Sequence, residues 1–229
     1  MVLEGLSKPQ VLKTVSLALT SVLFAICVFL PASAISSPRD NDPAVDLLRG
    51  VVIVTTYDGR GKPFMQGTGF FVRNDRIVTN YHVVRQAGSI QVATFDKKIA
   101  TVQRLVAFDN DSDLAVLQVD PVLVSGTVLQ LDDASLSEGE PVTVISNPRG
   151  DHWKIEHGRV GSTWNFQNQG PRIEITMTLR PGSSGGPIVN GNGRVVGVAV
   201  MSVGAADSLN FAIPIERLRS LAPFVGEPH

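Results

Sequence analysis

Ser184 lies in the glycine-rich segment RPGSSGGP (180–187), where Pro181 and Pro187 flank a tight turn. A serine hydroxyl attacks an amide only with the help of a base and of donors directed at the oxyanion that forms. Glycine allows the positive φ angles that tight turns need. The turn is therefore able to offer Ser184 as a nucleophile and the N–H groups of Gly182 and Ser184 as an oxyanion hole. The alternative interpretation is a Ser/Gly-rich surface turn.

Two other segments contain the groups that such a serine requires. His82 lies in TNYHVV (79–84), after a strand-like segment, and a neutral imidazole there could accept the serine proton and return it to the leaving amine. Asp113 opens the apolar segment DLAVL (113–117), where a carboxylate could fix the tautomer of the imidazole. The alternatives are a structural histidine and a turn aspartate, with Asp109 and Asp111 as rivals. We favour Asp113 because it directly adjoins the apolar segment.

Short β-branched segments separated by turn residues dominate the sequence from about residue 50. Six lie before a less apolar break at about 120–139 and six lie after it, at 50–56, 68–73, 76–79, 89–95, 99–107 and 114–119, then 142–146, 155–163, 173–179, 188–189, 195–203 and 209–213. Many short strands with regular turns are typical of an all-β barrel or sandwich. We therefore predict two six-stranded antiparallel β-barrels, at about 49–120 and 136–213, with the active site in the cleft between them. A short C-terminal helix is expected at 214–221, ended by Pro223.

The first 34 residues have the pattern of a secretory signal peptide. Lys8 and Lys13 precede an uncharged segment at 14–30, and an Ala-Ser-Ala sequence ends at Ala34. The uncharged segment is also about as long as the shortest membrane-spanning helix, so an uncleaved anchor is the alternative. Cleavage after Ala34 would also remove Cys27, the only cysteine. We expect an exported, periplasmic or extracellular protein without disulfides, with an N-terminal arm at 35–48.

The composition argues against several other functions. The 229 residues are 43% hydrophobic with a formal net charge of −1, so no strong attraction to nucleic acid is expected. No glycine-rich phosphate loop precedes a helix, so nucleotide binding is not indicated. His152 and His157 are five residues apart and fall on opposite faces of a predicted strand, which argues against a metal site. We expect no metal and no cofactor, and polypeptides as the binding partners.

The segments around His82, Asp113 and Ser184 resemble the three catalytic blocks of trypsin-like, chymotrypsin-fold serine proteases. The resemblance is greatest to the high-temperature-requirement (Deg/HtrA-type) proteases, with further matches at GTGFFV (67–72), SNP (146–148) and NFAIP (210–214). It covers about residues 50–218 and implies a protease domain at 49–222. It also implies that His82, Asp113 and Ser184 form the catalytic triad and that Gly182 and Ser184 form the oxyanion hole.

The resemblance further implies an exported serine endopeptidase that forms an acyl-enzyme and acts on unfolded or misfolded proteins. Thr178 would lie near the base of the specificity pocket, and Val198, Ala199 and Val200 would form one wall. No carboxylate lies at that base, so we expect cleavage after a small aliphatic or uncharged residue instead of Lys or Arg.

Three features depart from the family pattern. Family members usually carry PDZ domains after the protease domain, and we expect none here. Ser183 stands where Asn or Asp is usual, and the segment TMTLR (176–180) lacks the Asp and Asn that often precede the serine loop, with the bulky Arg180 near the turn. The alternative is therefore a protease-fold module that binds peptides or proteins with little or latent activity.

Overall fold

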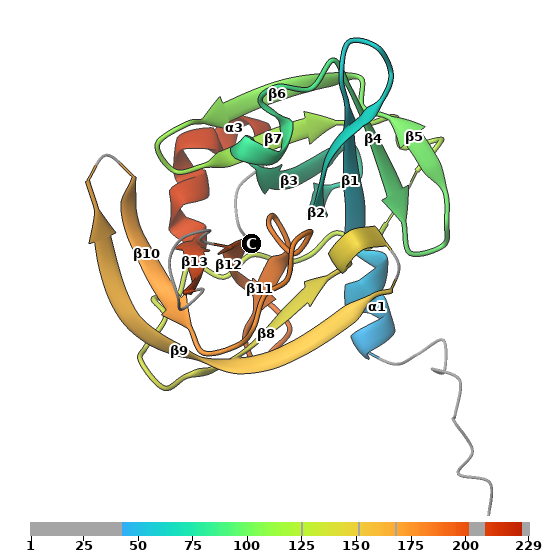
Figure 1. The fold of residues 1–229 in the computed structure, drawn as a ribbon. Coiled ribbons are helices and arrows are strands. Elements are labelled where there is room, and N and C mark those ends of the chain that lie inside the picture. The colour runs from blue at the N-terminus through green and yellow to red at the C-terminus, as the bar shows by residue number, and fades with distance from the viewer. Residues whose placement is uncertain (1–42, 125, 151, 168, 202–208, 226–229) are drawn as a thin grey trace, which may run out of the picture. The chain divides into compact units, whose positions relative to one another are not determined.

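The computed structural model describes residues 43–124, 126–150, 152–167, 169–201 and 209–225, whose strands form two antiparallel sheets (Figure 1). The predicted signal peptide and most of the predicted N-terminal arm lie outside the described residues. Within those residues, no helix is long and apolar enough to cross a membrane. Helix α1 (Pro43–Arg49) precedes the first strand, and its Leu47 and Leu48 pack against the hydrophobic core.

The first sheet contains seven strands in the spatial order β5-β4-β1-β2-β3-β7-β6. They are β1 (Val51–Tyr57), β2 (Pro63–Arg73), β3 (Arg76–Asn80), β4 (Ser89–Thr94), β5 (Ile99–Thr101), β6 (Arg104–Asp109) and β7 (Leu114–Gln118). The predicted single strand at 99–107 is in fact two strands, because the N–H of Val102 bonds to β4 whereas the N–H of Gln103 bonds to β7. Val102 and Gln103 thus connect β5 and β6, the strands at the two opposite edges of the sheet. The sheet therefore has seven strands instead of six, and it is curled on itself.

The second sheet is a closed barrel of six strands in the order β10-β13-β12-β11-β8-β9, as predicted. Its strands are β8 (Pro141–Ser146), β9 (Lys154–Phe166), β10 (Gly170–Ile175), β11 (Pro187–Val189), β12 (Val195–Met201) and β13 (Asn210–Pro214). A short 3₁₀ turn, η1 (Pro148–Gly150), follows β8. In Figure 1 the barrel occupies the yellow to red half of the molecule.

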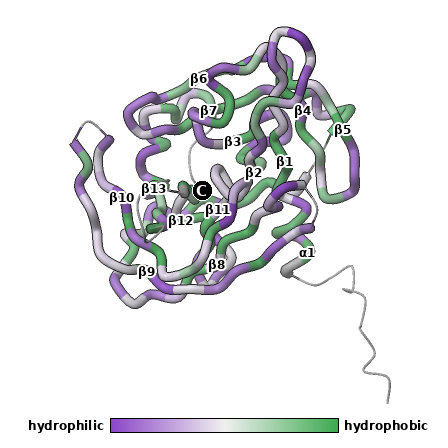
Figure 2. Tube along the Cα trace, viewed as in Figure 1, coloured by the Kyte–Doolittle hydropathy of each residue, from purple (hydrophilic) through white to green (hydrophobic). Residues whose placement is uncertain are grey.

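Neighbouring residues of one strand belong to different hydrophobic cores. On β7, Leu114 and Val116 face a core shared by the two sheets, whereas Ala115 faces the core inside the first sheet. On β12, Val198 belongs to the shared core and Ala199 to the core inside the barrel. Side chains alternate between the faces of a strand, so a strand buried on both faces has a continuous apolar sequence. Figure 2 shows hydrophobic residues along such strands.

The C-terminal helical segment is longer than predicted. A 3₁₀ helix, η2 (Ile215–Leu221), is followed directly by the α-helical turn α3 (Ala222–Val225), which contains Pro223. Proline does not end the segment because it is tolerated in the first turn of a helix, where its missing N–H has no intrahelical acceptor. Leu218, Leu221 and Val225 pack in the core that the two sheets share. The helix therefore joins the two halves of the molecule.

Candidate active site

His82 lies at the end of a strand of the first sheet. Strand β3 ends at Asn80, and the single helical turn α2 (Tyr81–Val84) follows it. Val83 and Val84 are buried in the core inside the first sheet. Because this turn presents its valines to the core, the side chain of His82 remains one-third exposed, at 33%.

The pairing of β3 with β7 brings Asp113 to His82. Asn80 is the register partner of Leu114, so the residue before Leu114 lies beside the first turn of α2. One carboxylate oxygen of Asp113 accepts the backbone N–H of His82, and the other lies 2.7 Å from the imidazole Nδ1. The N–H of Tyr81 bonds to the Asp113 carbonyl at 3.1 Å. With Nδ1 as the donor to this carboxylate, Nε2 is left to accept a proton.

Asp113 is also distinguished from its two rivals by its backbone. Its φ is 58°, in the left-handed region that residues other than glycine seldom adopt. Asp109 accepts hydrogen bonds from the N–H groups of Asp111 and Ser112 and so closes the loop, and Asp111 is exposed. The structure therefore brings Asp113, and neither of the rivals, against His82.

Ser184 lies in a turn in which two positions require glycine. Gly182 has a φ of 99° and Gly185 a φ of 89°. A Cβ at Gly185 would lie 2.1 Å from the carbonyl oxygen of Thr68, and a Cβ at Gly182 would lie 2.8 Å from a backbone nitrogen. Ser184 itself is 7% exposed. The glycines thus allow the turn to pack directly against β2.

Thr68 connects the serine loop to the strand that leads to His82. Its N–H donates to the carbonyl of Ser184 at 2.8 Å, and its hydroxyl donates to the carbonyl of Gly182 at 2.7 Å. Its own carbonyl accepts a hydrogen bond from the hydroxyl of Thr79 at 2.7 Å. Thr79 precedes His82 by three residues on the chain. The role of Thr68 was not deduced from the sequence, although its position between Gly67 and Gly69 was a signal of close backbone approach.

The geometry of the serine loop is compatible with an oxyanion hole. The carbonyl of Gly182 is held by Thr68, and its N–H donates no hydrogen bond within the described part of the chain. The N–H of Ser183 bonds to the carbonyl of Arg180 at 2.9 Å. Arg180 has an exposed side chain, whereas Ser183 is fully buried with its hydroxyl 3.1 Å from that of Ser146. Ser183 therefore anchors the loop to β8.

The four residues expected to bind substrate occupy three environments. Thr178 is exposed on the segment between β10 and the serine loop. The side chains of Val198 and Ala199 are fully buried in two cores, although the Ala199 backbone bonds to both Gly185 and Gly186 at 2.8 Å. Val200 lines the cavity that contains His82 and Asp113. Alternation along β12 places Val198 and Val200 on one face and Ala199 on the other, and Val200 reaches the cavity because it is only partly buried against the shared core.

That cavity has a volume of about 520 Å³ and lies beside the His82–Asp113 pair. Polar and charged side chains dominate its lining, which consists of Tyr81, His82, Arg85, Asn110, Asp111, Asp113, Gln167, Gln169, Arg172 and Val200. Arg172 is only 4% exposed and was not singled out from the sequence. An arginine in a strand of alternating polar and apolar residues is usually a solvated side chain, so no local signal marked it.

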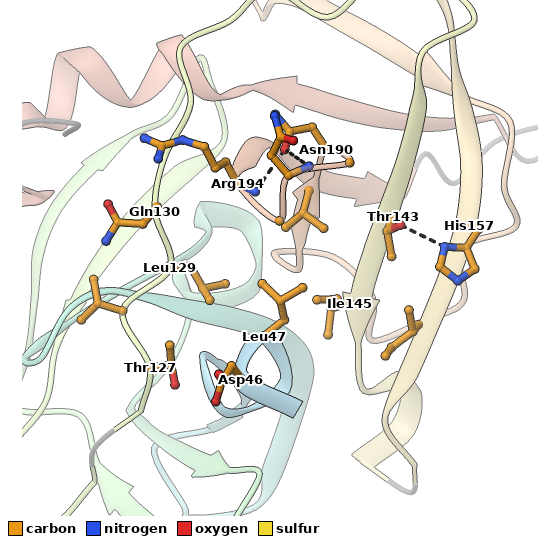
Figure 3. Close-up of a pocket in the computed structure, with 16 residues that line it drawn as sticks. Asp46, Leu47, Thr127, Leu129, Gln130, Thr143, Ile145, His157, Asn190 and Arg194 are labelled. Carbon is orange, nitrogen blue, oxygen red and sulfur yellow. Dashed lines mark hydrogen bonds between the residues drawn. The ribbon is translucent and has the colours of Figure 1, made fainter. Parts of the chain in front are cut away.

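A larger cavity of about 840 Å³ lies elsewhere, between α1 and the barrel (Figure 3). Leu47, Leu129 and Ile145 contribute apolar side chains to it, and His157 lies at its edge with Nδ1 2.9 Å from the hydroxyl of Thr143. None of the residues predicted to act in catalysis lines this cavity. His82 and Asp113 line the smaller, polar cavity, whereas Ser184 does not, so this cavity is the part of the candidate active site on the histidine side.

Comparison with known proteins finds serine endoproteases among the relatives of this chain. A periplasmic serine endoprotease of Hahella chejuensis, named as probable and DegP-like, is 37% identical over 161 residues, which are 66% of this chain and 33% of that protein. Protease Do-like 1 from the chloroplast of Arabidopsis thaliana is 29% identical over 91% of this chain and 55% of its own. The chain thus spans between a third and about half of these relatives. The crystal structure of a serine endoprotease from Yersinia pestis superposes with a TM-score of 0.69 at 25% identity, covering 82% of this chain and 67% of that one.

The family model for the trypsin-like peptidase domain matches residues 67–198, from strand β2 to strand β12. This range contains His82, Asp113 and Ser184, as well as Thr68. The match covers more than half of the sequence and includes strands of both antiparallel sheets. The chain belongs to the family of trypsin-like peptidase domains.

Proposed function

We propose that this protein is a serine endopeptidase that cleaves polypeptides through an acyl-enzyme intermediate. Ser184 Oγ attacks the scissile carbonyl carbon while His82 Nε2 takes its proton. The N–H groups of Gly182 and Ser184 stabilise the oxyanion. His82 then protonates the leaving amine, and water, activated by the same imidazole, hydrolyses the ester and restores the serine.

The contact between Asp113 and His82 is the observation that best supports this proposal. Two oxygens of one carboxylate are each 2.7 Å from a nitrogen of the same histidine, one from the backbone and one from the ring. A structural histidine would need only one such partner. The contact at Nδ1 fixes the tautomer of the ring, and together with the contact at the backbone N–H it fixes the ring's position, which is what a general base requires.

Labelling with a fluorophosphonate probe tests the proposal without knowledge of the substrate. We expect the wild-type chain to be labelled and labelling to be lost in Ser184→Ala and His82→Ala, because the probe reacts only with an activated serine. Ser162→Ala and His157→Ala are matched controls that should keep wild-type labelling, since both residues lie on β9 and neither lines the cavity beside His82. A folded wild-type chain that resists labelling would contradict the proposal and favour the alternative of a peptide-binding module with little activity.

We further propose that the substrates are unfolded or misfolded polypeptides outside the cytoplasm. The relative from Hahella chejuensis is named as periplasmic, and residues 1–34 have the pattern of a signal peptide. N-terminal sequencing of the exported protein should begin at Ile35, and an intact N-terminus would instead indicate an anchor. Cleavage of denatured casein but not of a stable folded protein would support the substrate class.

The proposed preference is for a small aliphatic or uncharged residue before the cleaved bond. Thr178 and Val200 offer no negative charge to a substrate cation. Mass-spectrometric mapping of cleavage sites should therefore find few after Lys or Arg. A majority after Lys or Arg would contradict this preference and leave the catalytic assignment intact.

A further inference from the structure

The loop that carries Asp113 has an unfavourable backbone conformation. It connects β6 to β7, and Asp113 at its end has a φ of 58°. Such a conformation costs about 1–2 kcal/mol for a residue with a side chain. The loop therefore needs contacts that hold Asp113 in place, and the first sheet alone supplies only part of them.

The first group of contacts lies within the loop. One oxygen of Asp109 accepts the N–H groups of Asp111 and Ser112 at 3.0 Å, and its other oxygen accepts the hydroxyl of Ser220 from η2 at 3.2 Å. Burial opposes ionisation of Asp109, but these hydrogen bonds from Ser112, Ser220 and Asp111 outweigh it and keep the pKa of Asp109 below its usual value. Asp109 thus acts as an anion that closes the loop.

The second group of contacts comes from Arg172, on β10 of the closed barrel. Its Nη2 lies 3.4 Å from the carbonyl of Asp111 and 3.3 Å from that of Ser112. Its Nη1 donates to the carbonyls of Gln169 and Pro171 at 2.7 and 3.2 Å. One planar guanidinium therefore connects the β9–β10 turn of the barrel to the two residues immediately before Asp113.

Ser112 is also held by an arginine of the C-terminal helical segment. Nε of Arg217, in η2, lies 2.8 Å from the hydroxyl of Ser112, and Ser112 is fully buried. Its carbonyl and its hydroxyl are thus bound by different cations, Arg172 and Arg217. Movement of Ser112 would carry the adjacent Asp113 with it.

Burying the guanidinium of Arg172 costs free energy unless its charge is balanced and its N–H groups donate hydrogen bonds. Burial lowers the pKa of Arg172, and the negative charge of Asp113 partly offsets this effect. The charged groups that line the same cavity are Arg85 from the α2 side, Asp111 and Asp113 from the loop, and Arg172 from β10, with the titratable imidazole of His82 among them. Replacing a whole buried ion pair by apolar residues of similar size is often neutral or stabilising, so packing alone does not require an arginine here.

We propose that Arg172 is a positioning residue that holds the 111–112 backbone so that the Asp113 carboxylate meets the backbone N–H and the ring Nδ1 of His82. This inference rests on the proposed serine peptidase function. Within the described part of the chain, the hydrogen bonds of Arg172 go to backbone carbonyls and none goes to His82 or Ser184, so Arg172 acts through Asp113. Arg217 supports the same loop through the hydroxyl of Ser112.

Two measurements on the full chain test this role. The low-field proton NMR resonance of the hydrogen bond between His82 Nδ1 and Asp113 reports the position of the carboxylate directly. The inactivation kinetics of a fluorophosphonate separate the maximal rate of serine modification from the binding constant of the probe. We compare Arg172→Met, Arg172→Lys and, as a control, Arg159→Met, because Arg159 on β9 is exposed and also bonds a backbone carbonyl, that of Gly139.

In Arg172→Met we expect the low-field resonance to weaken or disappear and the maximal inactivation rate to fall about ten- to a hundredfold, with the probe binding constant unchanged. Arg172→Lys retains the charge but cannot donate to both loops at once, so it should lie between Arg172→Met and the wild type. Arg159→Met should equal the wild type. A folded Arg172→Met with the wild-type resonance and rate would overturn the inference, and if that variant does not fold, wild-type values in Arg172→Lys would do so.

The outcomes also separate this inference from the proposed function. Wild-type protein that shows the low-field resonance but is not labelled would contradict the proposed activity. If Arg172→Met then lost that resonance, Arg172 would still be shown to position Asp113. Labelled wild type with unchanged Arg172 variants would leave the activity standing and remove only the role of Arg172.

Discussion

The loops that carry Ser184 and Asp113 are held in different ways. The serine loop is fixed mainly through its own backbone: the carbonyls of Ser184 and Gly182 accept hydrogen bonds from Thr68, and Gly185 bonds to β12. The aspartate loop is fixed by charged side chains from other elements, with Arg172 on β10 and Arg217 in η2.

The two loops also differ in which residues adopt positive φ angles. In the serine loop they fall on glycines, which adopt them without a steric cost, whereas in the aspartate loop the corresponding angle falls on Asp113 itself. We infer that the serine loop takes its conformation from its own glycines and tolerates little change at them. The aspartate loop depends on distant side chains, so changes there should have graded effects.

The largest effect is expected from Gly185→Ala. The new Cβ would lie 2.1 Å from the carbonyl oxygen of Thr68, at a φ of 89°. We expect a loss of about 3 kcal/mol or more in the free energy of unfolding and no fluorophosphonate labelling. Urea denaturation measures the first quantity. Gly191→Ala is the control, because a Cβ there has no neighbour within 4 Å. Equal stability of the two variants would contradict the inference that its own glycines set the conformation of the serine loop.

Asp113→Asn should follow in size. The amide is similar in shape, but its NH₂ group can face Nδ1 of His82 and leave the imidazole in the tautomer that cannot accept the serine proton. We expect the maximal labelling rate to fall by about four orders of magnitude with little change in stability. Asp111→Asn is the matched control and should retain most of the rate. A larger loss in Asp111→Asn than in Asp113→Asn would reverse the assignment of the carboxylate.

Ser183→Ala tests an anchor of the serine loop that comes from one of the loop's own side chains. Its hydroxyl lies 3.1 Å from that of Ser146 and is fully buried. Removing it leaves the Ser146 hydroxyl without this partner, so we expect a loss of about 1 kcal/mol in the free energy of unfolding. The exposed Ser162→Ala provides the control in the same denaturation experiment. A loss as large as that of Gly185→Ala would mean that side chains hold this loop as strongly as its backbone.

The smallest effect is expected from Asp109→Asn, and it should depend on pH. The pKa of Asp109 is lowered in the folded state from 3.8, so its ionised form stabilises the fold above that pH. The contribution should be lost as the pH falls through the lowered folded-state pKa. The stability difference between wild type and Asp109→Asn should thus be present at neutral pH and shrink in acid. A difference that is constant from neutral to acidic pH would exclude a role for the Asp109 charge.

Several features of the fold followed directly from the sequence. Short apolar segments identified the strands of the closed barrel, because strands buried on both faces have continuous apolar sequences. The first sheet was less predictable. Residues 99–107 form an uninterrupted strand-like segment, and only the hydrogen bonding of Val102 and Gln103 to different strands divides it.

The sequence by itself determined the serine loop. Gly182 and Gly185 occupy the positive-φ positions that the turn needs, and this requirement is contained within a few consecutive residues. The same local information identified His82 at a strand end and proposed Asp113 from the apolar segment that follows it.

The tertiary structure decided which side chains surround these groups. It buried Val198 and Ala199 and left Val200 at the cavity, and it brought Arg172 to Ser112 across 60 residues of sequence. No local pattern marks such an arginine, because its acceptors are backbone carbonyls that any residue could supply. Its contacts exist because the curled sheet and the closed barrel pack around a shared core, which places the β9–β10 turn against the loop before Asp113.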